Sequence, residues 1–416
     1  MNTITAAIQF GSYRICAAAA ICRDNGKREV CALESAPTNG CIKHGCVSNI
    51  EETAQIIKSL MLKLSNKVAS KGYGNLTSAY VGMCGISMHS MRFQPTTLAS
   101  PDNIITGEIK KQLEQACRNL NLPDRDILGI KCNSIRQEES QVMADYQLIV
   151  AESRLRMGIE QAMERAQIRV AGFFATPLTT ADILTTEEKQ LGCALIDMGA
   201  HLTTLSLYRD NELKYLMVIP LGSEAVTTDI ATLNLRQGEA ENMKQNWSDV
   251  SSICNNAATG ASSACPVNNK ELNFIVTSRY EEIAANVAMQ IDKAGLKNQL
   301  EGGCILTGGA SMQKGLTTLM GHRLEINRIC TRSCNTVSFS SSERKPHLAS
   351  LMSMLPYCTA SCEEKKVEVK VPVPQTDTPP ETSDNNVGGR SRAANSGRIS
   401  RGVSSFFGDL FSGLDS

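Results

Sequence analysis

Hydrophobic and polar residues follow two different periods along the chain, which predicts strands and helices in alternation. Residues 4–21 are predicted to form two strands joined by a turn at Gly11 and Ser12, and residues 50–68 repeat apolar side chains at helical spacing. Further helices are predicted over 106–120, 155–166, 223–233, 277–294 and from about 312, and further strands over 79–83, 170–174, 193–196, 202–208, 216–220 and 303–306. This alternation indicates an α/β protein. The pattern of strand, glycine turn and strand near residue 11 recurs near residue 199, which suggests two related halves.

The composition changes after about residue 361. Four of the 13 prolines fall within 372–380, and 375–398 holds few apolar residues, so we expect a disordered linker over 361–397. Hydrophobicity returns in 398–416, where one helical face would carry Ile399, Val403, Phe406, Phe407, Leu410, Phe411 and Leu414, with Arg401 and other arginines nearby. An amphipathic helix behind a long linker is typical of membrane-surface binding. The alternative is a helix that docks in a protein groove or on its own core.

Charge and cysteine usage exclude several classes of protein. Lys and Arg together number 42, as do Asp and Glu, so a protein whose main role is to coat nucleic acid is excluded. No run of 18 apolar residues is present, so no transmembrane helix is expected. The 16 cysteines lack CxxC pairs and the five histidines lack ligand spacing, which favours reduced thiols and argues against a histidine metal site.

Two predicted hairpins carry candidate phosphate chemistry. The first is the turn formed by Gly11, Ser12, Tyr13 and Arg14, whose backbone N–H groups could face a phosphate; a plain tight turn is the alternative. The second begins at Asp197 and Gly199 and continues to Thr203. An acid at the end of a buried strand suits Mg²⁺ held through water, and the alternative is an aspartate that caps a turn.

Two further motifs could contact a nucleoside. Gly308 and Gly309 follow an apolar strand and precede Ser311, so the backbone there could approach a planar ligand, or simply turn from strand to helix. Glu241 and Lys244 lie one helical turn apart. They could clasp a ribose or form a solvated ion pair.

Together, in this order, the four motifs resemble the actin/Hsp70/sugar-kinase superfamily. Within it the chain is similar to the bacterial cell-division family FtsA, over Cys193–Tyr208, 218–231, 279–283 and 306–310 and in its linker and terminal helix. The resemblance implies an actin-like (ribonuclease H-like) two-half α/β fold. It implies ATP with Mg²⁺, with phosphate contacts at Gly11–Arg14 and at Asp197, Gly199 and Thr203. It also implies ribose contacts at Glu241 and Lys244 and adenosine contacts at Gly308, Gly309 and Ser311.

The resemblance also implies a domain layout. A first core domain would comprise 1–85 with about 340–358, and a relocated small domain 86–155. The second core domain would comprise 156–225 with about 301–339, and its small domain 226–300, the expected docking site for the tubulin-like protein FtsZ.

Some residues depart from the family pattern. Gln9 stands where the family has an acid, Ala200 and His201 where it has glycine, and Thr204 where it has aspartate. Gln9 cannot act as a carboxylate, and the side chains at 200 and 201 crowd a phosphate loop. We therefore expect the adenosine half of the site to be better kept than the phosphate half, and hydrolysis to be inefficient.

The sequence thus predicts a non-enzymatic, peripheral-membrane scaffold on the cytoplasmic side of the division septum. It would self-associate, tether FtsZ and bind lipid through its terminal helix. Two alternatives stay open: an active ATPase or phosphotransferase of the same superfamily, and an actin-like platform for another membrane machine such as pilus assembly.

Overall fold

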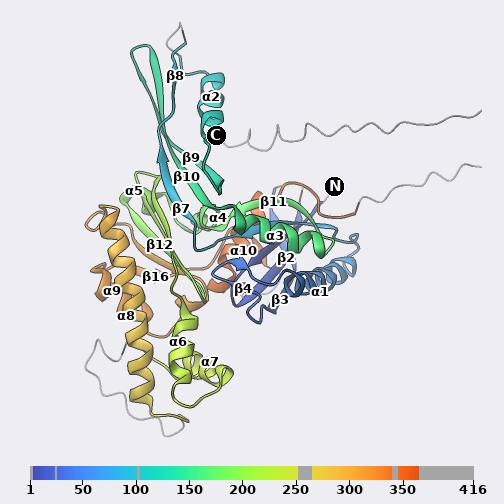
Figure 1. Ribbon diagram of the computed structural model, residues 1–416, viewed down its shortest axis with the longest axis vertical. Coiled ribbons are helices and arrows are strands. Elements are labelled where there is room, and N and C mark those ends of the chain that lie inside the picture. Colours follow the sequence, from blue (N-terminus) through green and yellow to red (C-terminus); the bar gives the residue numbers. More distant parts are fainter. Residues whose placement is uncertain (1–2, 24–25, 101–103, 252–264, 340–344, 365–416) are drawn as a thin grey trace, which may run out of the picture. The chain divides into compact units, whose positions relative to one another are not determined.

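The computed structural model describes residues 3–23, 26–100, 104–251, 265–339 and 345–364 (Figure 1). The chain divides into two compact units, 1–366 and 367–416, and the described residues all belong to the first. Among them, no helix has both the length and the apolar character that crossing a bilayer requires. None of the cysteines in these ranges forms a disulfide.

The first half is built on a six-stranded sheet. Strands β1 (Thr3–Phe10), β2 (Arg14–Cys22) and β3 (Arg28–Pro37) form an antiparallel meander, and β6 (Ser78–Met83) and β11 (Arg169–Ala175) add in parallel beside β1. The short strand β17 (Ser338–Phe339) pairs with the outer edge of β3. Helices α1 (Ile50–Ala69) and α3 (Ser153–Arg165) pack together and against this sheet, and α10 (Ala349–Met354) contacts β1, β2 and β6.

The second half repeats this strand order. Strands β12 (Cys193–Met198), β13 (Thr203–Arg209) and β14 (Glu212–Ile219) form the meander, while β15 (Gly303–Thr307) and β16 (Ile329–Thr331) add in parallel beside β12. The sheet orders β11-β6-β1-β2-β3 and β16-β15-β12-β13-β14 therefore correspond strand by strand. The two related halves predicted from the sequence are confirmed, and they give the chain an actin-like α/β fold.

Residues 86–155 carry an additional layer with a hydrophobic core of its own. It contains β7 (His89–Phe93), β8 (Thr96–Leu98), α2 (Gly107–Arg118) and a long hairpin of β9 (Arg125–Glu138) and β10 (Gln141–Glu152), packed around Ile109, Leu113, Val142 and Leu148. A single register pair, Met217 with His89, joins this layer to β14. The pattern of residues predicts neither strand of the hairpin: β9 is half-buried along most of its length without alternation, and β10 was missed although its burial is regular.

Three helices extend from the second half. Helices α6 (Ser223–Ala231), α7 (Gln237–Asn246) and α8 (Asn269–Lys293) share one hydrophobic core with β12, β13 and β15. Helix α8 begins eight residues before the predicted start, because the Asn268 side chain caps it at the Lys270 N–H. Part of the predicted loop over 245–270 is helical, and 252–264 lie outside the described residues. A 3₁₀ turn, η2 (Gly309–Met312), delays α9 to Leu316–Leu324.

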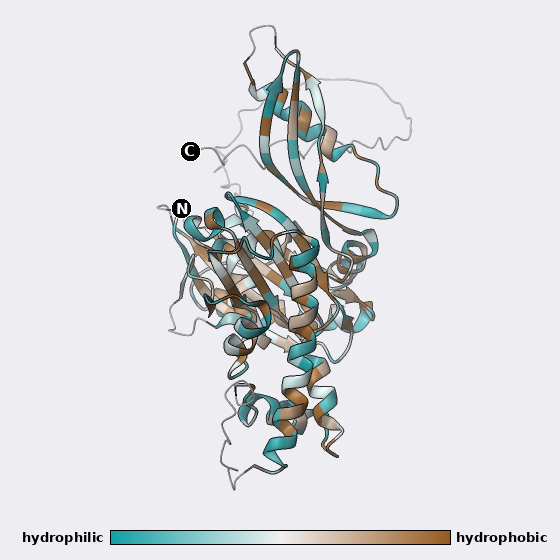
Figure 2. Ribbon diagram, turned by 90° about the vertical axis from the view of Figure 1, so that its left-hand side faces the viewer, coloured by the Kyte–Doolittle hydropathy of each residue, from teal (hydrophilic) through white to brown (hydrophobic). Residues whose placement is uncertain are grey.

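Short elements complete the described part. They are β4 (Ile42–Lys43), β5 (Cys46–Val47), α4 (Thr176–Thr180), η1 (Ala181–Ile183), α5 (Thr186–Leu191), η3 (Pro346–Leu348) and η4 (Leu355–Tyr357). The most hydrophobic segments in Figure 2 are strands of the two sheets, in keeping with the buried patterns of β1, β2 and β12.

The chain remains hydrogen-bonded to the first sheet beyond residue 361, where the sequence predicts that the linker begins. The Cys362 N–H donates to the Ile4 carbonyl at 2.9 Å, and the Thr77 N–H donates to the Cys362 carbonyl at 3.0 Å. Glu363 also forms a β-bridge with Leu76. Residues 361–364 therefore belong to the folded body rather than to the expected linker.

Candidate functional site

Two hairpin tips, one from each half, offer unpaired backbone donors. The β1–β2 turn is closed by the Gly11 N–H on the Arg14 carbonyl at 3.2 Å, and the β12–β13 turn by the Gly199 N–H on the Leu202 carbonyl at 2.8 Å. Within the described residues, no acceptor takes the N–H groups of Ser12 and Tyr13 or those of Ala200 and His201. Consecutive free N–H groups at a tight turn are suited to binding an anion such as a phosphate.

The loop between β4 and β5 connects the two tips. The Gly45 N–H donates to Ser12 Oγ at 3.3 Å, while the His44 N–H donates to His201 Nδ1 at 3.3 Å. The two imidazole rings lie 5.2 Å apart, centroid to centroid, at an angle of 51°. This short loop therefore brings the hairpin of the first half and the hairpin of the second half to one place.

The contact between His44 and His201 predicts a pH dependence. Burial, followed by the nearby His44 and Lys43, lowers the pKa of His201 below its usual 6.5, and Glu224 opposes them. Only a neutral imidazole has the lone pair that accepts the His44 N–H. Because the pKa of His201 is lowered, the contact is present at neutral pH and is lost as pH falls through that pKa. We expect amide hydrogen exchange at His44, corrected for the intrinsic rate, to accelerate as pH falls below the usual 6.5 of an imidazole.

The matched variants are His201→Gln and His322→Gln. A glutamine at 201 can accept the same N–H without titrating, so the acceleration should vanish. His322 is exposed on α9, and its replacement should leave the acceleration intact. A pH profile unaltered in His201→Gln would contradict this assignment.

Asp197 lies at the carboxyl end of β12, and the described part of the chain gives it no positive partner. The Ser350 hydroxyl donates to Asp197 Oδ2 at 2.7 Å, and no basic side chain of the described part forms an ion pair with it. Burial raises the pKa of this carboxyl, and the bond from Ser350 only partly opposes the rise. A carboxylate desolvated in this way favours a bound cation.

The Gly308–Gly309 turn packs directly against this acid. Gly308 has a φ of +84°, and a Cβ there would lie 2.4 Å from Asp197 Oδ1 and 2.5 Å from the Met198 carbonyl oxygen, so only glycine fits. Gly309 is exposed, whereas Ser311 is buried and its hydroxyl donates to the Gly308 carbonyl at 2.7 Å. The turn thus leaves backbone at Gly309 open to a ligand, while the Ser311 hydroxyl is already engaged.

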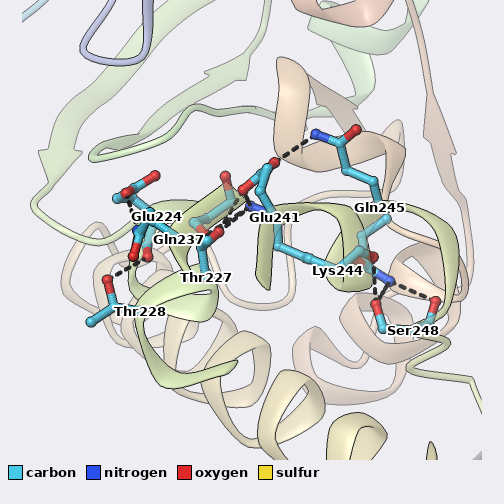
Figure 3. Close-up of polar contacts among 10 residues, drawn as sticks. Glu224, Thr227, Thr228, Gln237, Glu241, Lys244, Gln245 and Ser248 are labelled. Carbon is cyan, nitrogen blue, oxygen red and sulfur yellow. Dashed lines mark hydrogen bonds and ion pairs between the residues drawn. The ribbon is translucent and has the colours of Figure 1, made fainter. Parts of the chain in front are cut away.

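Glu241 and Lys244 form a buried pair that holds α7 against α6 (Figure 3). Lys244 Nζ lies 2.7 Å from Glu241 Oε2 and donates to Thr227 Oγ1 at 2.7 Å and to the Ser223 carbonyl at 3.0 Å. The Thr227 hydroxyl donates to Glu241 at 2.6 Å. Burial would raise the pKa of Glu241, but the charge and hydrogen bond of Lys244 outweigh it and the pKa is lowered. All three ammonium donors of Lys244 therefore have acceptors, whereas the Glu241 side chain stays 18% exposed and its Oε1 accepts only from the Gln245 amide, at 2.6 Å.

The other predicted residues of the second hairpin are also engaged. Thr203 is buried, and its hydroxyl donates to the Leu221 carbonyl at 2.8 Å. The first N–H groups of α6, on Ser223 and Glu224, donate to the Gly199 and Ala200 carbonyls at 3.0 and 2.8 Å. The start of α6 is therefore closed by the hairpin itself.

The structure brings the two tips, Asp197 and Gly308 together. That the adenosine half is better kept than the phosphate half stays a prediction. The phosphate side keeps free backbone donors, whereas Glu241 and Lys244 are engaged with each other. The sequence did not indicate His44, Gly45 or Ser350, which come from short elements without periodic patterning. The expected membrane residues Ile399, Arg401, Val403, Phe406, Phe407, Leu410, Phe411 and Leu414, and the linker over 365–397, lie outside the described residues.

Comparisons with known proteins show which protein family the chain resembles. The family model described as Cell division protein FtsA matches residues 194–384. Cell division protein FtsA of Porphyromonas gingivalis is 30% identical over 417 aligned residues, covering 91% of this chain and 85% of the relative. The protein of the same name from Neisseria meningitidis is 24% identical over 335 residues, covering 74% and 79%.

Among solved structures, the PilM–PilN type IV pilus biogenesis complex superposes with a TM-score of 0.63 at 17% identity, covering 84% of this chain and 96% of that one. At that identity the likeness establishes the fold alone. The relatives found by sequence establish more than the fold: the chain belongs to the FtsA family of bacterial cell-division proteins.

Proposed function

We propose that this protein is an actin-like scaffold that polymerises and tethers FtsZ to the cytoplasmic face of the membrane at the division septum. The observation that carries the proposal is 30% identity to an FtsA protein across 91% of the chain. The paired halves add a body of the expected architecture. The similarity to the pilus complex extends to the fold only, so it does not favour the pilus alternative.

The terminal segment is the proposed membrane anchor. Its seven large apolar residues, from Ile399 to Leu414, would share one helical face, and its arginines would be attracted to anionic headgroups. An isolated helix with Gly402, Gly408 and Gly413 is marginal in water, so folding would accompany binding. Because Asp409 and Asp415 oppose anionic lipid, one copy should bind reversibly and a polymer strongly.

The site fits a nucleoside triphosphate with Mg²⁺ in part. Free N–H groups at Ser12, Tyr13, Ala200 and His201 would hold phosphate oxygens, and Asp197 would hold Mg²⁺ through water. Bound Mg²⁺ would neutralise phosphate charge. The Lys244 ammonium already has three acceptors and is not available to the ribose.

Gln9 is a reason to expect nucleotide binding without efficient hydrolysis. It lies on β1, paired with Cys16, and its neutral amide cannot take a proton from an attacking water. We therefore propose ATP as a structural or regulatory ligand rather than a substrate.

Replacing Asp197 tests the nucleotide proposal. Because burial raises the pKa of Asp197, its charged form costs stability at neutral pH, so Asp197→Asn should melt no lower than the parent without ligand. The same variant should lose the rise in melting temperature that Mg-ATP gives the parent. Asp210→Asn, in the exposed β13–β14 turn, is the control and should keep that rise. A full Mg-ATP response in Asp197→Asn would contradict the role.

The scaffold function is tested by pelleting the full chain with polymerised FtsZ in solution. We expect more of the chain to pellet when FtsZ polymers are present than when they are absent. Deletion of residues 365–416 should not alter this, since docking is assigned to the folded body. Equal amounts in the pellet with and without FtsZ would contradict the tethering role.

A further inference from the structure

A buried threonine, Thr38, lies against the tip of the first hairpin. Strand β3 ends at Pro37, which pairs with Arg14 in the register of the sheet, so the next residue, Thr38, lies beside Tyr13. Only 1% of Thr38 is exposed. The Cys41 N–H donates to the Thr38 carbonyl at 2.9 Å, which fixes the backbone on its other side. Thr38 is therefore held in place from both directions along the chain.

Thr38 binds two carbonyl groups of the hairpin tip. Its hydroxyl donates to the Ser12 carbonyl at 2.5 Å, and its N–H donates to the Tyr13 carbonyl at 3.1 Å. In a trans peptide, the carbonyl and the N–H that follows it point in opposite directions. Because the Ser12 carbonyl points toward the buried hydroxyl of Thr38, the Tyr13 N–H points away from it. Within the described residues, that N–H has no acceptor.

The second hairpin orients its free N–H groups in the same way, but with backbone groups alone. The Gly199 carbonyl accepts from the Ser223 N–H at 3.0 Å, and the Ala200 carbonyl accepts from the Glu224 N–H at 2.8 Å. The N–H groups of Ala200 and His201 therefore point away from α6. A helix start holds the second tip, whereas a single side-chain hydroxyl contributes to holding the first, so only the first tip depends on which residue stands at one position.

We propose that Thr38 is a positioning residue for the phosphate site: its hydroxyl holds the Ser12–Tyr13 peptide so that the Tyr13 N–H is presented to a phosphate oxygen of the nucleotide. The inference rests on the proposed nucleotide function and adds the side chain that sets the first tip. Without the hydroxyl, the Ser12 carbonyl would lose its donor and the peptide would be free to rotate. A rotated peptide would turn a carbonyl oxygen toward the phosphate, and neither of those groups can donate.

Calorimetric titration of the full chain with Mg-ATP tests this role. Thr38→Val keeps the backbone N–H and the approximate shape but removes the hydroxyl, and it should weaken Mg-ATP binding about tenfold. Thr38→Ser restores the hydroxyl and should bind like the parent. Thr5→Val is the matched control, because the Thr5 hydroxyl is also buried and donates to the Ala20 carbonyl at 3.3 Å, further along the same pair of strands. This control should keep the affinity of the parent even where it lowers the melting temperature.

Amide hydrogen exchange at Tyr13 gives a second measurement, which does not require that any variant folds. Mg-ATP should slow this exchange in the parent, and Thr38→Val should lose that protection while Thr5→Val keeps it. Three results would overturn the inference and leave nucleotide binding intact: Mg-ATP binding without a change at Tyr13, equal affinity in Thr38→Val, or a loss in Thr38→Ser as large as in Thr38→Val. Absence of Mg-ATP binding by the parent would overturn the nucleotide proposal and this inference together.

Discussion

Ending the chain at Glu364 is expected to release it from anionic vesicles that bind the full chain. The structure sets this end point, because residues 361–364 pair with the first sheet and so belong to the folded body. Each large apolar side chain that enters the lipid interface contributes about 2 kcal/mol. Loss of Phe406, Phe407 and Phe411 alone should therefore weaken binding by more than about a hundredfold.

Flotation with phosphatidylglycerol vesicles measures this effect. A full-length variant with Phe406, Phe407 and Phe411 replaced by Ser separates the apolar face from mere chain length and should behave like the truncation. The matched control replaces Ser404, Ser405 and Ser412 by Ala on the opposite face and should float like the parent. If truncated and full chains float equally, the anchor lies elsewhere and this assignment is wrong.

Arg332→Met is expected to destabilise the protein by about 3–5 kcal/mol, because it leaves a buried carboxylate without its partner. Arg332 donates to both oxygens of Glu188, at 2.8 and 2.7 Å, and also to the Ile183 carbonyl. The Glu188 side chain is 2% exposed. These contacts hold α5 and η1 against the segment that follows β16. Their loss should therefore destabilise the whole second half.

The same pair predicts an acid transition. The hydrogen bonds from Arg332 outweigh burial and lower the pKa of Glu188 to about 2. A lowered carboxyl pKa means that the stabilisation is present above its unfolded pKa of about 4.5 and is lost as pH falls toward about 2. The parent should lose stability over that range, and Arg332→Met should show a smaller slope there.

Urea unfolding across that pH range provides the measurement. Arg328→Met is the control, since Arg328 is 61% exposed and lies 3.8 Å from the same carboxylate, and it should cost less than about 1 kcal/mol. Equal losses of unfolding free energy in the two variants would show that the buried ion pair of Arg332 stabilises the protein no more than the exposed contact of Arg328.

Periodicity predicted several elements whose burial is regular. Helix α1 buries one face at helical spacing, and β1, β2 and β12 are almost continuously apolar, so each appeared close to its observed bounds. Strand β9 was not predicted because its side chains are half-buried without alternation. Strand β16 was not predicted because it is only three residues long. Both errors arise where tertiary contacts rather than local pattern decide the structure.

The candidate site was only partly predictable for a related reason. Asp197 and Gly308 could be found because each follows a buried strand, where a polar residue or a glycine stands out. The role of Lys244 could not be found, because spacing along α7 does not reveal that Thr227 and the Ser223 carbonyl of α6 occupy its other donors. His44 lies between two-residue strands, and only the fold brings it to His201.

Recruitment of fluorescent FtsZ to vesicles is the most direct measurement of the central proposal, that this protein joins FtsZ to a membrane. Vesicles of phosphatidylglycerol would be mixed with FtsZ and either the full chain or the chain ending at Glu364. We expect FtsZ on the vesicle surface only with the full chain, while the truncated chain still binds FtsZ in solution. Recruitment by both chains, or by neither while the full chain binds the vesicles, would contradict it.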